Sequence, residues 1–128
     1  MNKNSFEAEL LHTPFDKEDA YHSLSMPVYN TAAYEFDTAE AMEEAFCGRT
    51  ADHAYSRITN PTVQYFEKRI QTITGALSVT ALNSGMAAIS NIFFTLAQAG
   101  ANIVTSAHLF GNTYSFFKST LAAFGVEV

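Results

Sequence analysis

The sequence predicts an α/β fold in which helices cover a parallel sheet. In the region 76–128, strand-length apolar runs alternate with helical segments, and glycines separate them. The apolar runs are 77–82, 102–107 and 126–128, and the helical segments between them are 85–98 and 111–124. This β-α-β-α-β order is typical of parallel strands joined by helical crossovers. Because a doubly wound sheet has more strands than these, we expect the chain to be the N-terminal part of a longer protein.

Composition narrows the class of protein. The 128 residues are 48% hydrophobic and 16% charged, as in ordinary globular domains. A net charge of −6 argues against nucleic-acid binding, which needs a basic surface. No signal peptide is visible at residues 1–4, and no apolar run reaches the roughly 18 residues of a membrane span. The single cysteine, Cys47, excludes an internal disulfide and favours a cytoplasmic protein.

Residues 1–36 differ from the rest because their prolines, the polar cluster at 16–19 and their scattered aromatics show no helical period. They predict an extended arm. Tyr29, Tyr34 and Phe36 need a surface on which to bury their rings, and two alternatives stay open: the chain's own core or another subunit.

Two helices are predicted next. Thr38 suits the N-cap of a helix over 39–46, with Asp37, Glu40, Glu43 and Glu44 at its start and on a solvated face. Gly48 suits its end. After a polar loop, Asn60 and Pro61 open the second helix, Gly75 ends it, and its apolar face consists of Val63, Phe66, Ile70 and Ile73.

The two later helices also have apolar faces. In the helix 85–98 we expect Met86, Ile89, Ile92, Phe93 and Leu96 to point inward. In the helix 111–124 the corresponding residues are Tyr114, Phe117 and Leu121.

The turn at Ser84 and Gly85 joins the first predicted strand to a helix that starts with small residues. The first N–H groups of such a helix lack partners and carry the positive end of its dipole, so they favour an anion. Gly85 lets a phosphate approach the backbone, and Ser84 can add a hydroxyl donor. Simple packing of small residues is the alternative.

Tyr55 and Arg57 lie in a polar loop without a core to fill. In an extended segment this alternation places a phenol beside a guanidinium on one side, which suits phosphate. A surface arginine beside a packing tyrosine is the alternative. His12, His22, His53 and His108 share no ligand spacing, so we expect no metal site, and Cys47 has no implied base to make it a nucleophile.

Three motifs in this order carry a family resemblance: "YSRITNPTVQYFEKRI", "LNSGMAAIS" and "HLFGNTYSFFKSTLAAFGVEV". With "PVYNTAAYEF" before them, they resemble the N-terminal third of the trans-sulfuration enzymes of cysteine and methionine metabolism, which depend on pyridoxal 5'-phosphate. The O-acetylhomoserine sulfhydrylase branch looks most similar. The resemblance implies a fold-type I architecture, with an arm and phosphate-contacting loop over 1–60 and the start of the cofactor-binding domain over 61–128.

The resemblance also implies roles for residues. The amides of Gly85 and Met86, with Ser84, would hold the cofactor phosphate. Tyr55 and Arg57 would reach the phosphate in the neighbouring subunit of a homo-oligomer, in many relatives a homotetramer. Phe110 stands where the family usually has a tyrosine stacked on the pyridine ring. It keeps the stacking face and loses the hydroxyl, although a core aromatic at a helix start is the alternative.

No catalytic residue is expected in this chain, because the family's Schiff-base lysine, its aspartate and its substrate-binding arginine come later. The local sequence around the family's Schiff-base lysine is not found at any of the four lysines of this chain, Lys3, Lys17, Lys68 and Lys118. The implied reaction is γ-replacement on an O-acetylhomoserine-like amino acid by sulfide or a thiol, and these residues alone are expected to be inactive. A γ-lyase acting on methionine or cystathionine and a non-catalytic phosphate-binding or assembly domain are the alternatives.

Overall fold

The computed structural model describes residues 5–15 and 21–128, and the polar cluster at 16–19, Lys3 and Lys17 lie outside these ranges. The chain forms two compact units, Met1–Ala81 and Leu82–Val128, and each is described by itself. The boundary expected after residue 60 concerns the cofactor-binding domain of a complete enzyme, and it stays a prediction.

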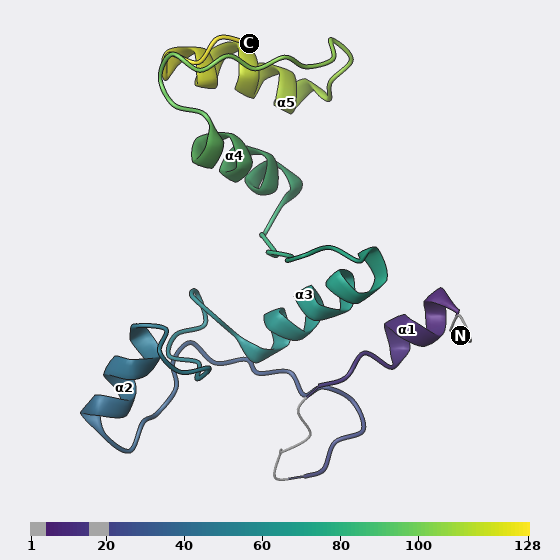
Figure 1. Ribbon diagram of the computed structural model, residues 1–128, viewed down its shortest axis with the longest axis vertical. Helices are drawn as coiled ribbons and strands as arrows, with labels where there is room; N and C mark the ends of the chain where they lie inside the picture. The colour runs from purple at the N-terminus through teal and green to yellow at the C-terminus, as the bar shows by residue number, and fades with distance from the viewer. Residues whose placement is uncertain (1–4, 16–20) are drawn as a thin grey trace. The chain divides into compact units, whose positions relative to one another are not determined.

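The N-terminal arm is not wholly extended, because it contains helix α1 (Phe6–Leu11) (Figure 1). Ser5 caps it by accepting a hydrogen bond from Ala8 N at 3.3 Å. The prediction of an arm without helix was therefore wrong here. Fewer than two turns are too short for an apolar period to be recognised. The segment after α1 packs on α3, since Tyr65 donates from its hydroxyl to the carbonyl of Thr13 at 3.1 Å.

The first unit also contains α2 (Ala39–Phe46) and α3 (Pro61–Thr74), and both predicted helices are confirmed. Thr38 Oγ1 caps α2 by accepting from Ala41 N at 3.1 Å. α3 ends at Gly75, whose φ of 67° is in the left-handed region that glycine adopts without strain.

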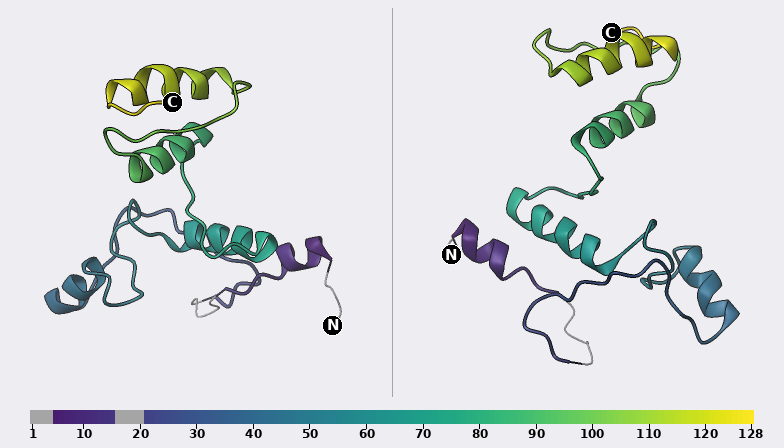
Figure 2. Two further views of the ribbon diagram at one scale, coloured as in Figure 1. Left: turned by 45° about the horizontal axis from the view of Figure 1, so that its top comes forward. Right: turned by 180° about the vertical axis from the view of Figure 1, so that it is seen from behind.

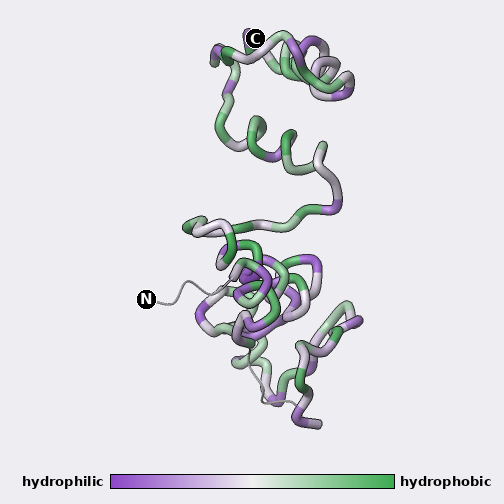
Figure 3. Tube along the Cα trace, turned by 90° about the vertical axis from the view of Figure 1, so that its right-hand side faces the viewer, coloured by the Kyte–Doolittle hydropathy of each residue, from purple (hydrophilic) through white to green (hydrophobic). Residues whose placement is uncertain are grey.

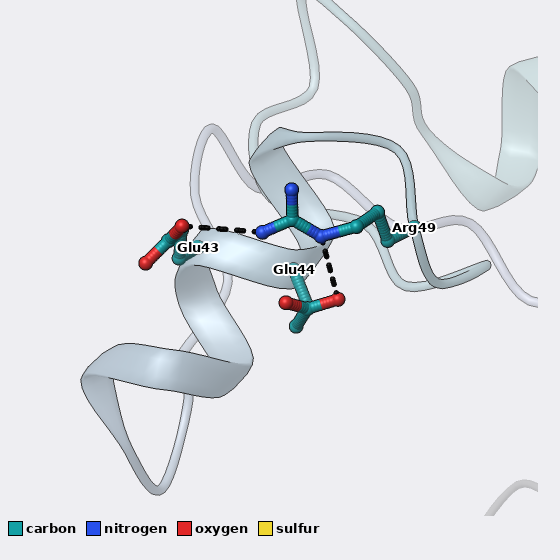
Figure 4. A network of polar contacts seen from close by, with 3 residues as sticks. All are labelled: Glu43, Glu44 and Arg49. Carbon is teal, nitrogen blue, oxygen red and sulfur yellow. Dashed lines mark hydrogen bonds and ion pairs between the residues drawn. The ribbon is translucent and has the colours of Figure 1, made fainter.

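The expected acidic face of α2 is partly neutralised by Arg49 (Figure 4). The guanidinium binds Glu44 at 2.8 Å and Glu43 at 3.1 Å, and both carboxylates come from the last turns of α2. The hydrogen bond to Glu44 is the main cause of the raised pKa of Arg49. The two ion pairs hold the chain against α2 where it leaves the helix.

The second unit contains α4 (Gly85–Leu96), α5 (Gly111–Ser115) and the π-helix η1 (Phe116–Leu121), which continues α5. The helix predicted over 111–124 is thus present, and its second half is π-helical. The core of the second unit is made of Phe116, Phe117, Leu121 and Val126. Phe93 of α4, a mainly hydrophobic helix in Figure 3, packs edge-on against Phe117 with 4.7 Å between ring centroids.

The predicted inward faces are only partly correct. Met86, Ile89 and Phe93 pack on the core as expected. Ile92 and Leu96 do not, because their side chains are 53% and 77% exposed, and Tyr114 is 49% exposed. In this unit the core covers one narrow stripe of α4.

The three predicted strands do not form ladders among the described residues. The runs 102–107 and 126–128 meet in one parallel bridge between Asn102 and Glu127, where Glu127 N donates to the carbonyl of Ala101 at 2.9 Å. Figure 2 shows this last segment lying beside α5 in both views. Residues 77–82 have no bridge. A strand forms only where a neighbouring backbone supplies its hydrogen-bond partners. The predicted strands are not formed because the described residues do not supply these partners.

Candidate functional site

The N-terminus of α4 begins at the predicted Ser84–Gly85 turn. Ser84 has extended backbone angles, and its Oγ accepts a hydrogen bond from Ala87 N at 3.0 Å. Ala88 N is the next donor and binds the carbonyl of Ser84 at 3.0 Å. Ser84 therefore caps the helix itself, while its hydroxyl proton stays available to a further acceptor.

The amides of Gly85 and Met86 have no hydrogen-bond acceptor within the described ranges of the chain. These are the two N–H groups between Ser84 and the capped Ala87, and they carry the positive end of a 12-residue helix. Polar groups of this kind are normally satisfied by solvent or by a ligand.

Space above these amides is open. Ser84 and Gly85 are exposed, and a Cβ built on Gly85 meets no atom within 4 Å. The glycine is therefore not required by contacts with the protein's own atoms. Two free donors at a helix start with an unobstructed approach fit a phosphate group.

The α5 start lies against the same end of α4. The buried hydroxyl of Thr113 contacts Met86 Sδ at 3.6 Å, and Thr113 is one helical turn after Phe110. Phe110 thus precedes by one helical turn the residue that contacts the Met86 side chain. Sequence reasoning missed Thr113, because nothing local distinguishes a hydroxyl that touches a distant sulfur from one that caps a helix.

Phe110 occupies the N-cap position of α5, and its side chain is 76% exposed. Phe110 is therefore not part of the core that the described residues form, and its role stays a prediction. An exposed ring at the start of α5 offers a stacking face to a planar ligand.

Tyr55 and Arg57 lie together in the first unit. The prediction of an extended segment was wrong, because residues 56–58 form a turn in which Ile58 N and Thr59 N both bind the carbonyl of Tyr55, at 2.8 and 3.0 Å. The side chains still meet: the guanidinium carbon of Arg57 is 5.2 Å from the centroid of the Tyr55 ring. Their role in phosphate binding remains a prediction.

The arm contributes to this loop. Tyr55 forms an antiparallel bridge with Ala33, and Ser56 N donates to the carbonyl of Ala32 at 2.9 Å. Tyr34 is only partly exposed and lies against His53, with 5.7 Å between ring centroids. These contacts favour the alternative in which the arm packs on its own unit.

Other candidate groups have structural contacts. Lys68 donates to Gln71 at 3.1 Å, and Lys118 Nζ lies 5.5 Å from the Tyr114 ring centroid. Cys47 is an exposed free thiol at the end of α2.

The residues that the structure describes contain no group of three potential metal-ligating side chains. None of their helices is long and apolar enough to cross a membrane.

Comparison with known proteins decides the family. The family model for Cys/Met metabolism PLP-dependent enzymes matches residues 7–128. The chain belongs to this family.

Individual relatives agree with the family. The chain is 40% identical over 123 residues to O-acetyl-L-homoserine sulfhydrylase 1 of Thermus thermophilus, covering 96% of this chain and 29% of the relative. It is 36% identical over 123 residues to L-methionine gamma-lyase of Pseudomonas putida, covering 96% of this chain and 31% of that relative. The chain thus spans about a third of the length of the curated relatives that it matches.

A solved structure also resembles this one. A protein of Campylobacter jejuni, which carries N'-pyridoxyl-lysine-5'-monophosphate at position 205, superimposes with a TM-score of 0.85 and 30% identity, covering 95% of this chain and 30% of that one. The family's fold is therefore shared over nearly all of the present chain.

Proposed function

We propose that this chain is the N-terminal part of a pyridoxal-phosphate enzyme that replaces the γ-acetoxy group of O-acetylhomoserine with sulfide or a thiol and releases acetate. The observation that carries the proposal is that the amides of Gly85 and Met86 have no acceptor among residues 5–15 and 21–128, in a chain of this family. The identity to a sulfhydrylase of Thermus thermophilus supports the choice of substrate.

The residues at the start of α4 fit the cofactor phosphate. The N–H groups of Gly85 and Met86 donate to phosphate oxygens, and the Ser84 hydroxyl adds a third donor while its oxygen continues to cap Ala87. These donors are fixed before binding, so they need no reorganisation. Bound pyridoxal phosphate supplies an electron sink that makes deprotonation next to the substrate amine accessible.

Phe110 supplies an apolar face to the cofactor ring. Because phenylalanine has no hydroxyl, it can orient the ring but cannot move a proton, so proton transfer at the leaving group falls to another group or to water. The exposure of its ring and its place at the start of α5 support this role.

Tyr55 and Arg57 complete a phosphate site in the neighbouring subunit of a homo-oligomer. The phenol donates one hydrogen bond, and the guanidinium donates two to a doubly charged group. Such a site requires two chains. We propose a cytoplasmic homo-oligomer, in line with the single free cysteine.

The runs 77–82, 102–107 and 126–128 become strands of a fold-type I sheet in the complete protein. The parallel bridge between Asn102 and Glu127 supports this, since it has the direction that the sheet requires. The Schiff-base lysine lies outside these residues, and the pyridoxyl-lysine at position 205 of the Campylobacter jejuni protein supports that view. We therefore expect the 128-residue chain mixed with pyridoxal phosphate to show no stoichiometric absorbance band of a lysine Schiff base. Treatment with borohydride, which reduces such a Schiff base to a stable amine, should leave no cofactor attached in a one-to-one ratio.

The test of the reaction uses the complete protein loaded with pyridoxal phosphate. With O-acetylhomoserine and sulfide, we expect acetate and homocysteine in equal amounts, measured by chromatography. Acetate release that does not depend on sulfide, with 2-oxo acid as the product, would contradict replacement.

A γ-lyase is the second candidate, and the 36% identity to L-methionine gamma-lyase of Pseudomonas putida favours it. It would convert methionine and water to a 2-oxo acid, ammonia and methanethiol. Incubation of the same preparation with methionine alone separates the two: 2-oxo acid formation identifies the lyase.

A further inference from the structure

Asn60 makes more contacts than a helix cap requires. Its side chain is buried, with 7% of its surface exposed, and its Oδ1 accepts from Thr62 N at 2.9 Å and from Val63 N at 3.4 Å. This acceptor role caps α3, and Asp or Ser would perform it equally well.

The Nδ2 group of Asn60 has a separate set of partners. It donates to the carbonyl of Tyr29 at 3.0 Å, to Ser56 Oγ at 2.9 Å and to the hydroxyl of Tyr34 at 3.2 Å. Two protons serve three acceptors, so one hydrogen bond is shared. One amide therefore joins the arm, the loop and the helix.

Ser56 is the central residue of the Tyr55–Arg57 pair. Its Oγ lies 3.3 Å from the Tyr34 hydroxyl and donates to the carbonyl of Thr31. With Asn60 as the third contact, the peptide that carries both phosphate-binding side chains is fixed by the arm and by the cap of α3.

We propose that Asn60 is the positioning residue of the Tyr55–Arg57 pair, and that its Nδ2 group holds the loop in the geometry that binds phosphate. This inference rests on the function proposed above for Tyr55 and Arg57. It assigns the two ends of one side chain to different tasks, the carbonyl oxygen to helix stability and the amide nitrogen to the site.

The substitution Asn60→Asp separates the two tasks, because the carboxylate keeps the cap and loses both N–H donors. In the complete oligomeric protein, we expect it to weaken pyridoxal phosphate binding about tenfold, the effect of losing hydrogen bonds that total about 1.4 kcal/mol. Binding of pyridoxal, which lacks the phosphate, should change less than about twofold. Thr38→Ala, which removes the cap of α2, is the matched control and should lower the melting temperature with cofactor affinity unchanged.

A double-mutant cycle distinguishes positioning from general loss of structure. If Asn60 acts through Arg57, the protein with Asn60→Asp and Arg57→Ala binds the cofactor within about twofold of Arg57→Ala alone. Full additivity of the two losses, or an Asn60→Asp protein with unchanged affinity, overturns the positioning role. An Arg57→Ala protein with unchanged affinity overturns instead the proposed function of the loop, and the inference with it.

Tyr34→Phe keeps the proposal testable if Asn60→Asp does not fold. It removes the hydroxyl that bridges Asn60 and Ser56 and leaves the ring in place. We expect about a threefold loss of pyridoxal phosphate affinity that disappears in the Arg57→Ala background. Unchanged affinity, or a loss that persists in that background, would overturn the inference.

Discussion

The guanidinium carbon of Arg57 lies 5.2 Å from the centroid of the Tyr55 ring, and both residues belong to a turn that leaves the guanidinium exposed. A cation over the face of a phenol ring is attracted by about 0.5–1 kcal/mol at an exposed position. The two side chains are therefore held together before any phosphate arrives.

Arg57 should bind phosphate through its planar fork as well as through its charge. We expect Arg57→Ala to weaken pyridoxal phosphate binding at least about tenfold, and Arg57→Lys to recover only part of the loss, because an ammonium keeps the charge and loses the bidentate geometry. Titration followed by absorbance measures both. Full recovery with lysine would show that the charge alone matters.

Gly85 should be needed by the ligand and not by the fold. Because a Cβ at Gly85 meets open space, Gly85→Ala should leave stability unchanged or raise it by up to about 1 kcal/mol, while its methyl group obstructs the amides and lowers cofactor affinity about tenfold. Gly111→Ala is the matched control, since Gly111 also begins a helix in open space. If both substitutions change cofactor affinity equally, the amides at Gly85 and Met86 are not a specific phosphate site.

His53 should make the fold sensitive to acid. Burial lowers the pKa of His53 from 6.5, and the charge of Asp52 partly opposes this. The unfolded chain then binds a proton more readily than the folded one, so the free energy of unfolding should fall as pH decreases below about 6.5.

The measurement is urea unfolding between pH 7.5 and 5, with His53→Gln as the comparison. The substituted protein should lose this part of the pH dependence. An identical pH profile in the two proteins would contradict the prediction.

Leu121 should be the most sensitive core position of the second unit, because only 1% of its side chain is exposed. Leu121→Ala should lower the free energy of unfolding by about 2–5 kcal/mol, from lost burial and the remaining cavity. Leu96→Ala, at a side chain 77% exposed, is the control and should cost little. Equal losses from both would contradict the assigned core.

Much of the helical fold is local and was predictable. Thr38 and Asn60 each cap the helix expected from them, because a cap needs only its own side chain and the next turn. Ser84 also caps its helix, although its hydroxyl was expected only as a donor to a phosphate. The six residues of α1 were missed since they are too few to show a period. The π-helix η1 was missed because no residue type or apolar period distinguishes it from the α-helix that it continues.

Contacts between distant residues were not predictable from the pattern. The free amides at Gly85 and Met86 follow from a helix start, but the bridge from Thr113 to Met86 depends on how α4 and α5 pack. Asn60 is a second example. Its role as a helix cap was expected, but the hydrogen bonds from its Nδ2 to Tyr29 and Tyr34, which lie 31 and 26 positions earlier in the chain, were not. Strand pairing at 77–82 is equally non-local, since a strand needs the backbone of another.

An experimental structure of the complete protein with pyridoxal phosphate tests the central claim most directly. We predict phosphate oxygens about 2.7–3.2 Å from both Gly85 N and Met86 N. A phosphate bound elsewhere, with these two amides hydrogen-bonded to groups of the protein, would contradict the account.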